Sequence, residues 1–310
     1  MVSRGIIAPG TLYRGARAEV ITAALTFPAM QLDSTRTAAT AFISLALSAV
    51  ALAQNPTERD LDANPAAEAL PEPVDGSPLD GARVLVFTKT AGFVHASIPA
   101  GKRAVMELGA AHGFAVDTSS DASRFSDEGL APYAAVVFLS TTGDVLDAAQ
   151  EAAFERYIAR GKGYVGVHAA ADTEYDWPFY RELVGRQFVQ HPEHQTATVY
   201  PVPAGVEDFP GGERVMAGFG DSLTLFEEWY EYTVPYAVGL RDLMRVDTAT
   251  YSTRGYKGTE AMGVYHPLAW YHEHGGGRAF YTGIGHMDET FALPAFREHL
   301  LAGIGWAVGG

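Results

Sequence analysis

Residues 163–172 read GYVGVHAAAD, a short apolar run that stops at a histidine. Residues 164–167 have the length and apolar character of a buried strand, and the small residues after His168 suit a tight turn into a helix. In many α/β hydrolytic folds this strand-to-helix turn carries the nucleophile, usually serine or cysteine. The stretch therefore predicts an α/β fold and makes His168 a candidate functional residue.

Strand and helix patterns alternate around this stretch. Apolar runs predict strands at 83–87, 114–116, 134–139 and 163–167, and helical periodicity predicts helices at 99–112 and 147–160. Further strand patterns and a closing helix follow at 196–202, 223–232, 243–247, 268–272, 278–284 and 294–306. The alternation predicts right-handed βαβ units, and so a mostly parallel sheet with helices on both faces and some antiparallel edge strands.

Composition limits the chemistry of the site. The 310 residues are 47% hydrophobic and contain no cysteine, which excludes disulfides, thiolate zinc sites and a cysteine nucleophile. A metal would have to use His, Asp, Glu and water. The net charge of -15 and the lack of a basic block argue against a nucleic-acid partner. We expect no nucleotide or flavin cofactor.

The first part of the chain resembles a targeting segment. Residues 37–53 read TAATAFISLALSAVALA, follow Arg36 and end on an A-x-A pattern. This pattern predicts a signal peptide at 30–53, cleaved after Ala53, and favours it over a buried core helix. Residues 1–29 are then an extension from a start codon assigned too early. We expect a secreted or periplasmic protein with no membrane association after cleavage.

A linker is expected between the signal peptide and the folded domain. Residues 54–81 hold five prolines, seven acidic residues and one arginine. Such a segment buries too little apolar area to offset its ordering entropy, which predicts disorder. The single α/β domain is then expected to cover residues 82–310.

Ligands of open parallel sheets bind outside the carboxyl ends of the strands. That rule brings together the loops at 88–98, 140–145 and 168–177. The candidate substrate-binding residues on them are His95, Ser97, Thr141, Thr142 and Trp177.

Candidate acid–base residues follow two of the strands. His168 and Asp172 are four residues apart at an expected helix start, where the aspartate could orient the imidazole. The alternative is a structural helix cap. His286, in GIGHMDE, ends another strand. His191 and His194, in QHPEH, form only a weak ligand pair, because Pro192 predicts a turn.

The best carboxylate candidate lies in FEEWYEY at 226–232. Glu227 and Glu228 are neighbours, so in an extended strand only one faces inward, and we expect Glu228. Trp229 and Tyr230 could stack on a sugar ring or could be core aromatics. Arg278 could bind a substrate anion or hydroxyl group.

Seven motifs occur in an order that resembles one family. They are TKTAGFVHASIPAG, FLSTTGDVL, GYVGVHAAADTEYDWPFY, GRQFVQHP, EEWYEY, YHPLAWYHE and GRAFYTGIGHMDETF. Together they resemble the trehalose-utilisation (ThuA-like) family. The resemblance implies a flavodoxin-like fold similar to class I glutamine amidotransferases, and a role on disaccharides or their 3-keto forms. His168 takes the place of the amidotransferase cysteine, which excludes glutaminase chemistry by that route.

Three functional interpretations remain open. In the first, an exported carbohydrate-processing enzyme binds one divalent metal ion through His168, Glu228 and His286. In the second, His168 and Asp172 act as a metal-free general base. In the third, the chain is a non-catalytic periplasmic saccharide-binding protein, which the several histidines at strand ends disfavour.

Overall fold

The computed structural model describes residues 79–234, 237–257 and 263–309. The predicted extension at 1–29, the predicted signal peptide and the linker up to residue 78 lie outside the described residues. Residues 79–81, which the sequence assigned to the linker, contact the domain: Leu79 is buried in the core, and the Gly81 amide donates to the Gly113 carbonyl at 3.0 Å. Within the described ranges, no helix combines the length and the apolar character needed to cross a membrane.

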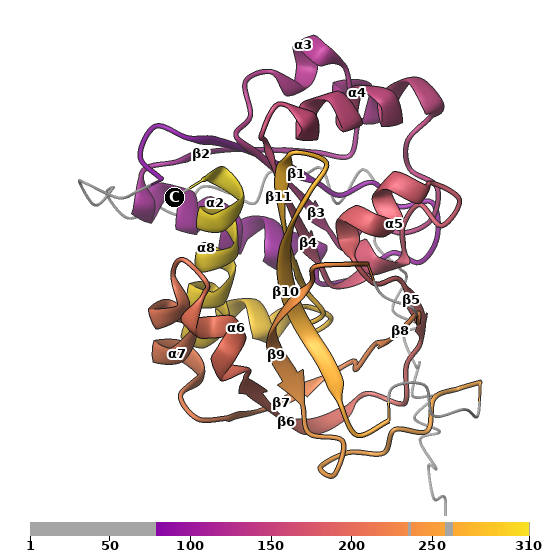
Figure 1. Ribbon diagram of the computed structural model, residues 1–310, viewed down its shortest axis with the longest axis vertical. Helices are drawn as coiled ribbons and strands as arrows, with labels where there is room; N and C mark the ends of the chain where they lie inside the picture. Colours follow the sequence, from indigo (N-terminus) through magenta and orange to yellow (C-terminus); the bar gives the residue numbers. More distant parts are fainter. Residues whose placement is uncertain (1–78, 235–236, 258–262, 310) are drawn as a thin grey trace, which may run out of the picture. The chain divides into compact units, whose positions relative to one another are not determined.

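A nine-stranded sheet forms the centre of the fold, and its first five strands are parallel. Their order is β2 (Ala115–Ser119), β1 (Arg83–Phe87), β3 (Ala135–Leu139), β4 (Gly163–Val167) and β11 (Gly277–Thr282) (Figure 1). The apolar runs at 83–87 and 163–167 predicted β1 and β4 with the observed bounds. The carboxyl ends of these strands therefore meet at one edge, as ligand sites of this architecture require.

The sheet continues as four antiparallel strands. Beyond β11 lie β10 (His266–His274), β9 (Arg241–Val246), β6 (Gln195–Pro201) and β7 (Leu223–Glu227). The prediction of a mostly parallel α/β sheet with antiparallel edge strands is confirmed.

The predicted single strand at 223–232 is wrong. The chain leaves the large sheet after Glu227 and pairs again only at β8 (Glu231–Tyr232), which joins β5 (Phe188–Gln190) in a separate two-stranded sheet. Residues 228–230 therefore form a connection between two sheets, and the strict alternation of an extended strand does not apply to them.

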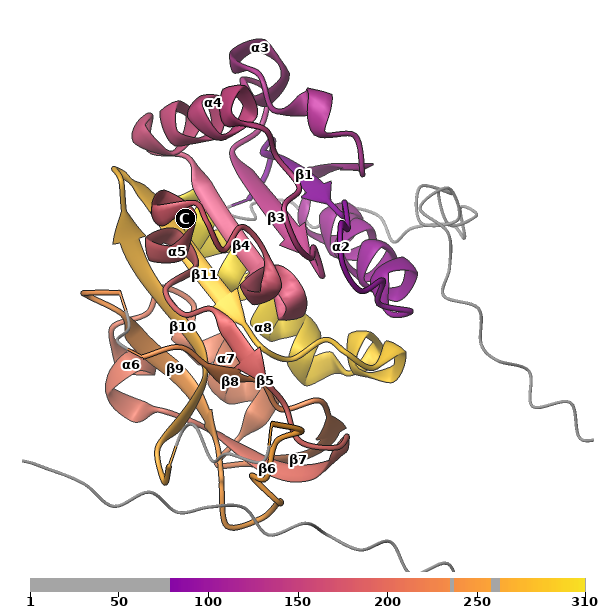
Figure 2. The same cartoon turned by 90° about the vertical axis from the view of Figure 1, so that its right-hand side faces the viewer.

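Helices cover both faces of the large sheet (Figures 1 and 2). One face carries α2 (Ile98–His112), α6 (Pro203–Glu207), α7 (Gly212–Phe219) and α8 (Pro294–Val308). The other carries α3 (Asp127–Leu130), α4 (Ala148–Ala159) and α5 (Pro178–Val184). Three short 3₁₀ helices complete the described elements: η1 (Ala122–Arg124), η2 (His168–Asp172) and η3 (Asp288–Ala292).

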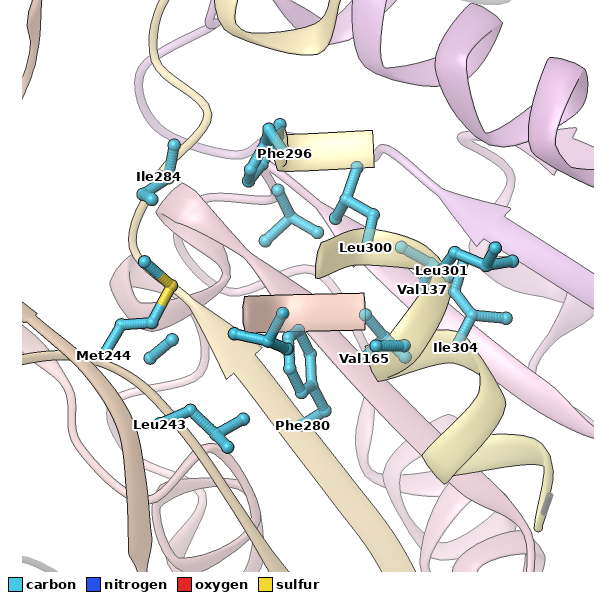
Figure 3. Close-up of a cluster of buried hydrophobic side chains, with 14 of the residues drawn as sticks. Val137, Val165, Leu243, Met244, Phe280, Ile284, Phe296, Leu300, Leu301 and Ile304 are labelled. Carbon is cyan, nitrogen blue, oxygen red and sulfur yellow. The ribbon is translucent and has the colours of Figure 1, made fainter. Parts of the chain in front are cut away.

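Alternate residues of the central parallel strands supply the two hydrophobic cores. In β1, Val84 and Val86 pack under α2, whereas Leu85 and Phe87 pack on the opposite face. Figure 3 shows part of the first core, in which side chains of the sheet meet those of α8. The labelled members are Val137, Val165, Leu243, Met244, Phe280, Ile284, Phe296, Leu300, Leu301 and Ile304. This packing anchors the strand ends from which the candidate site is built.

Candidate functional site

Glu228 lies at the centre of a cluster of histidines. Its side chain is buried, and its two carboxylate oxygens face different imidazoles. Oε2 lies 3.2 Å from Nε2 of His168 and 3.1 Å from Nδ1 of His286. Oε1 lies 3.1 Å from Nε2 of His191 and 3.0 Å from Nε2 of His194. Four imidazoles therefore surround one carboxylate.

His168 is held firmly at the end of β4. It is fully buried and has a left-handed backbone with φ of 50°, which is uncommon for a residue other than glycine. Its Nδ1 lies 2.9 Å from the Gly283 carbonyl, and the Tyr281 hydroxyl donates to the His168 carbonyl at 2.8 Å. The Tyr230 ring packs on the imidazole with centroids 4.3 Å apart. Only Nε2 is left to face the cluster.

Glu227 positions the loop that carries His286. This fully buried carboxylate accepts hydrogen bonds from the backbone amides of Gly285, His286 and Met287 at 3.1–3.5 Å, and from the Thr290 hydroxyl at 2.5 Å. The adjacent carboxylates thus have separate structural tasks: Glu227 holds a loop, and Glu228 faces the histidines.

His95 closes the inner side of the cluster. It is 3% exposed, and its ring centroid lies 4.8 Å from that of His168 and 5.2 Å from that of His286. Its Nδ1 is buried and has no hydrogen-bond partner among the described residues. Burial, reinforced by the charges of His168 and His286, lowers the pKa of His95 well below its usual value. A neutral imidazole with a free ring nitrogen is ready to bind a metal.

Charge coupling dominates the buried His168–Glu228 pair. Burial alone would raise the pKa of the Glu228 carboxyl, but hydrogen bonds and charge from His168 and His286 outweigh it and lower that pKa. Burial opposes protonation of His168, yet contact with Glu228 raises its pKa. Both pKa shifts have the same cause: a positive charge on His168 or His286 stabilises the ionised Glu228 carboxylate, and the carboxylate stabilises that charge.

Two overlapping sets of side chains could hold a metal ion. The inner set is His95, His168, Glu228 and His286, and the outer set is His191, His194 and Glu228. Within each set the potential ligand atoms lie within 4.8 Å of one another. Imidazole nitrogen together with carboxylate oxygen suits zinc and other first-row divalent ions.

A family model for ThuA, described as trehalose utilisation, matches residues 83–307. The chain belongs to the ThuA family. This confirms the resemblance that the seven motifs indicated, over nearly the whole described domain. No curated protein matches the chain.

Two solved structures show the fold that the family implies. A ThuA-like protein from Bacteroides uniformis is 21% identical, with a TM-score of 0.60 over 76% of this chain and 93% of its own. A ThuA-like protein from Parabacteroides merdae is 21% identical, with a TM-score of 0.56 over 74% of this chain and 90% of its own. At this identity the similarity shows the fold alone, and the predicted flavodoxin-like α/β architecture is confirmed.

The structure brings together the three predicted metal ligands of this ThuA-family chain but not the predicted His–Asp pair. His168, Glu228 and His286 converge as expected, whereas Asp172 accepts a hydrogen bond from Tyr175 at 2.7 Å. The Nδ1 atom of His168 is occupied by Gly283 instead. The prediction of a shared helix face is wrong because residues 168–172 form a 3₁₀ helix, in which residues three apart, not four, align.

Several predicted substrate-binding side chains belong to the core. Trp177, Trp229 and Tyr230 are at most 5% exposed and cannot stack on a sugar. Thr141 and Thr142 are fully buried and bond to the Thr173 hydroxyl and the Phe93 carbonyl, respectively. These predictions are wrong because apolar packing and loop closure use the side chains.

Two other predicted substrate-binding residues do not face the site. Ser97 donates to the Gly285 carbonyl at 2.8 Å and so helps to hold the loop before His286. Arg278 pairs with Gly163 at the amino ends of β11 and β4, whereas His168 follows the carboxyl end of β4. Arg278 therefore lies at the opposite end of the sheet and does not join the site.

Exposed aromatic side chains border the cluster instead. Phe93 is 54% exposed and its ring centroid lies 4.8 Å from that of His95, and Tyr256 is 62% exposed and 5.3 Å from His191. Tyr175, bonded to Asp172, is 40% exposed. The sequence indicated the two histidines of QHPEH only weakly, because the pairing of β5 with β8 that brings them to Glu228 spans about forty residues.

Proposed function

We propose that this ThuA-family chain is a metal-dependent enzyme that processes a carbohydrate, a disaccharide or its keto derivative. The observation that carries the proposal is the convergence of His95, His168, Glu228 and His286 at the carboxyl edge of the sheet. Imidazole nitrogens and a carboxylate oxygen are ligands that suit a divalent ion such as zinc. When bound in this histidine cluster, a divalent ion would activate a water molecule or polarise a carbonyl group.

The hydrogen bonds of His168 support a cation at this position. A backbone carbonyl only accepts hydrogen bonds, so Nδ1 of His168 must carry the hydrogen that points at Gly283. In the neutral ring Nε2 then presents a lone pair to Glu228 Oε2, 3.2 Å away. Two acceptors then face each other, and a proton or a metal ion between them would stabilise this arrangement. A carbonyl on the remote nitrogen is also the usual support for a metal-bound histidine.

The chain's own residues prepare the site in other ways. Tyr230 and the buried loops exclude water from the inner face of His168, and Glu227 fixes the backbone that carries His286. Phe93 and Tyr256 offer exposed rings beside His95 and His191, and aromatic faces suit the C–H faces of sugars. The family description, trehalose utilisation, agrees with a saccharide as the substrate.

Export is a separate part of the proposal. It is supported by the basic residue, apolar run and A-x-A end at 36–53. Cell fractionation with N-terminal sequencing tests it: a mature chain that begins near residue 54 is expected, and an uncleaved cytoplasmic chain contradicts it.

Metal analysis and turnover test the proposed function together. The purified chain is stripped with chelator, reloaded with zinc or manganese, and assayed on trehalose and on 3-keto-trehalose. We expect stoichiometric metal and metal-dependent turnover, both lost in His168→Ala and retained in His112→Ala, a histidine on α2 outside the cluster. Saccharide binding without metal or turnover would contradict the enzyme and favour a binding protein.

A further inference from the structure

We infer that Glu228 bridges two metal ions and that the outer ion, held by His191 and His194, meets the substrate. This inference rests on the proposed function and deepens it. The first support is that the two carboxylate oxygens of Glu228 face different sets of histidines. Oε2 faces the inner histidines and Oε1 faces the outer pair at 3.0–3.1 Å, so neither oxygen is shared between the two sets. A carboxylate that offers one oxygen to each of two sites is a bridging ligand.

The second support is the orientation of His191. Its Nδ1 lies 2.8 Å from the Pro192 carbonyl and must therefore carry the hydrogen. In the neutral ring, its Nε2 presents a lone pair to Glu228 Oε1, 3.1 Å away. His168 has the same arrangement on the other carboxylate oxygen, with Gly283 as the carbonyl. Each side of Glu228 thus has a histidine whose Nδ1 faces a backbone carbonyl and whose Nε2 faces a carboxylate oxygen, as in a metal-binding histidine.

The two ligand sets differ in whether they leave a coordination position open to solvent. The inner set provides four protein ligands, and its His95, His168 and Glu228 are buried. The outer set provides three, and the side chains of His191 and His194 are 29% and 39% exposed. Closed four-ligand sites are typical of structural metals, whereas three protein ligands leave a position for water or substrate.

A surface pocket lies over the outer set. His191 and His194 line it together with Arg254, Gly255 and Tyr256, and it measures about 270 Å³. The Tyr256 amide donates to the His191 carbonyl at 3.2 Å, which holds the exposed tyrosine ring beside the outer pair. A sugar stacked on Tyr256 would therefore present its hydroxyl or carbonyl oxygens to the outer ion.

Zinc alone is the probe for this inference. The chelator-treated chain is titrated with zinc, and bound metal is counted by elemental analysis after dialysis. We expect two equivalents in the wild type, one in His191→Ala/His194→Ala, and two in His112→Ala. X-ray absorption on the wild type should show a metal–metal distance of about 3.5–4 Å, without reliance on any variant.

The outcomes separate this inference from the proposed function. One equivalent in the wild type, lost in His168→Ala, would overturn the bridge and leave the inner metal intact. Two equivalents that persist in the folded His191→Ala/His194→Ala variant would also overturn it. No bound zinc at all would overturn both proposals.

Discussion

Replacing Glu227 with glutamine should separate its role from that of its neighbour. Glu227 Oε2 accepts from the amides of His286 and Glu228, and Oε1 accepts from two further amides and Thr290. A glutamine supplies one carbonyl oxygen, so in either orientation its NH₂ group faces at least two N–H donors. Each buried donor left without an acceptor costs about 1–3 kcal/mol, which predicts a loss of about 3 kcal/mol.

Urea unfolding in the presence of chelator measures this loss without a contribution from bound metal. The matched control is Glu289→Gln, an exposed acid in the same loop, which should change the unfolding free energy by less than about 0.5 kcal/mol. Zinc affinity of Glu227→Gln should fall by about 10–100-fold, because the His286 backbone loses its anchor. An unfolding free energy within about 1 kcal/mol of the wild type would refute the positioning role.

Three further predictions concern other parts of the chain. Burial raises the pKa of Glu174 to about 7, from a usual 4.5, despite hydrogen bonds from Val145 and Leu146. The stability that Glu174 contributes is complete below pH 4.5 and is lost as pH rises through 7. The unfolding free energy of Glu174→Gln relative to the wild type should therefore rise between pH 4.5 and 8 in urea titrations. Gly163→Ala would overlap the Ala307 carbonyl and should cost about 2 kcal/mol by thermal unfolding, whereas Gly305→Ala, with no atom within 4 Å, should not destabilise α8. Tyr256→Ala should weaken saccharide binding about tenfold in calorimetry and spare zinc binding, with the exposed Tyr265→Ala as control.

The central parallel strands could be predicted because they are buried on both faces. Continuous apolar runs at 83–87 and 163–167 are strong local signals, and both strands have the predicted bounds. The short elements between residues 178 and 232 lack such a signal. The three residues of β5 and the two of β8 pair only because distant parts of the chain bring them together.

The same distinction between local and long-range signals explains which residues of the candidate site could be predicted. His168 and His286 follow strands, so the general position of ligand sites in this architecture indicated them. The choice between Glu227 and Glu228 assumed a continuous strand, but the chain turns out of the sheet after Glu227 and buries both carboxylates. His191 and His194 depend on the long-range pairing of β5 with β8, for which local periodicity has no signal.

The backbone of His168 bears on why a histidine follows β4. A left-handed φ of 50° costs a residue other than glycine about 1 kcal/mol or more. Glycine would remove that cost, as it does at Gly285, which has φ of 134° in the loop before His286. The Tyr281 hydroxyl that holds the His168 carbonyl would serve glycine equally well. The imidazole contacts that glycine would lack are those with Gly283, Glu228, His286 and the neighbouring rings. The strained turn is therefore stabilised through the side chain, and its geometry directs Nε2 of that side chain at the carboxylate of Glu228.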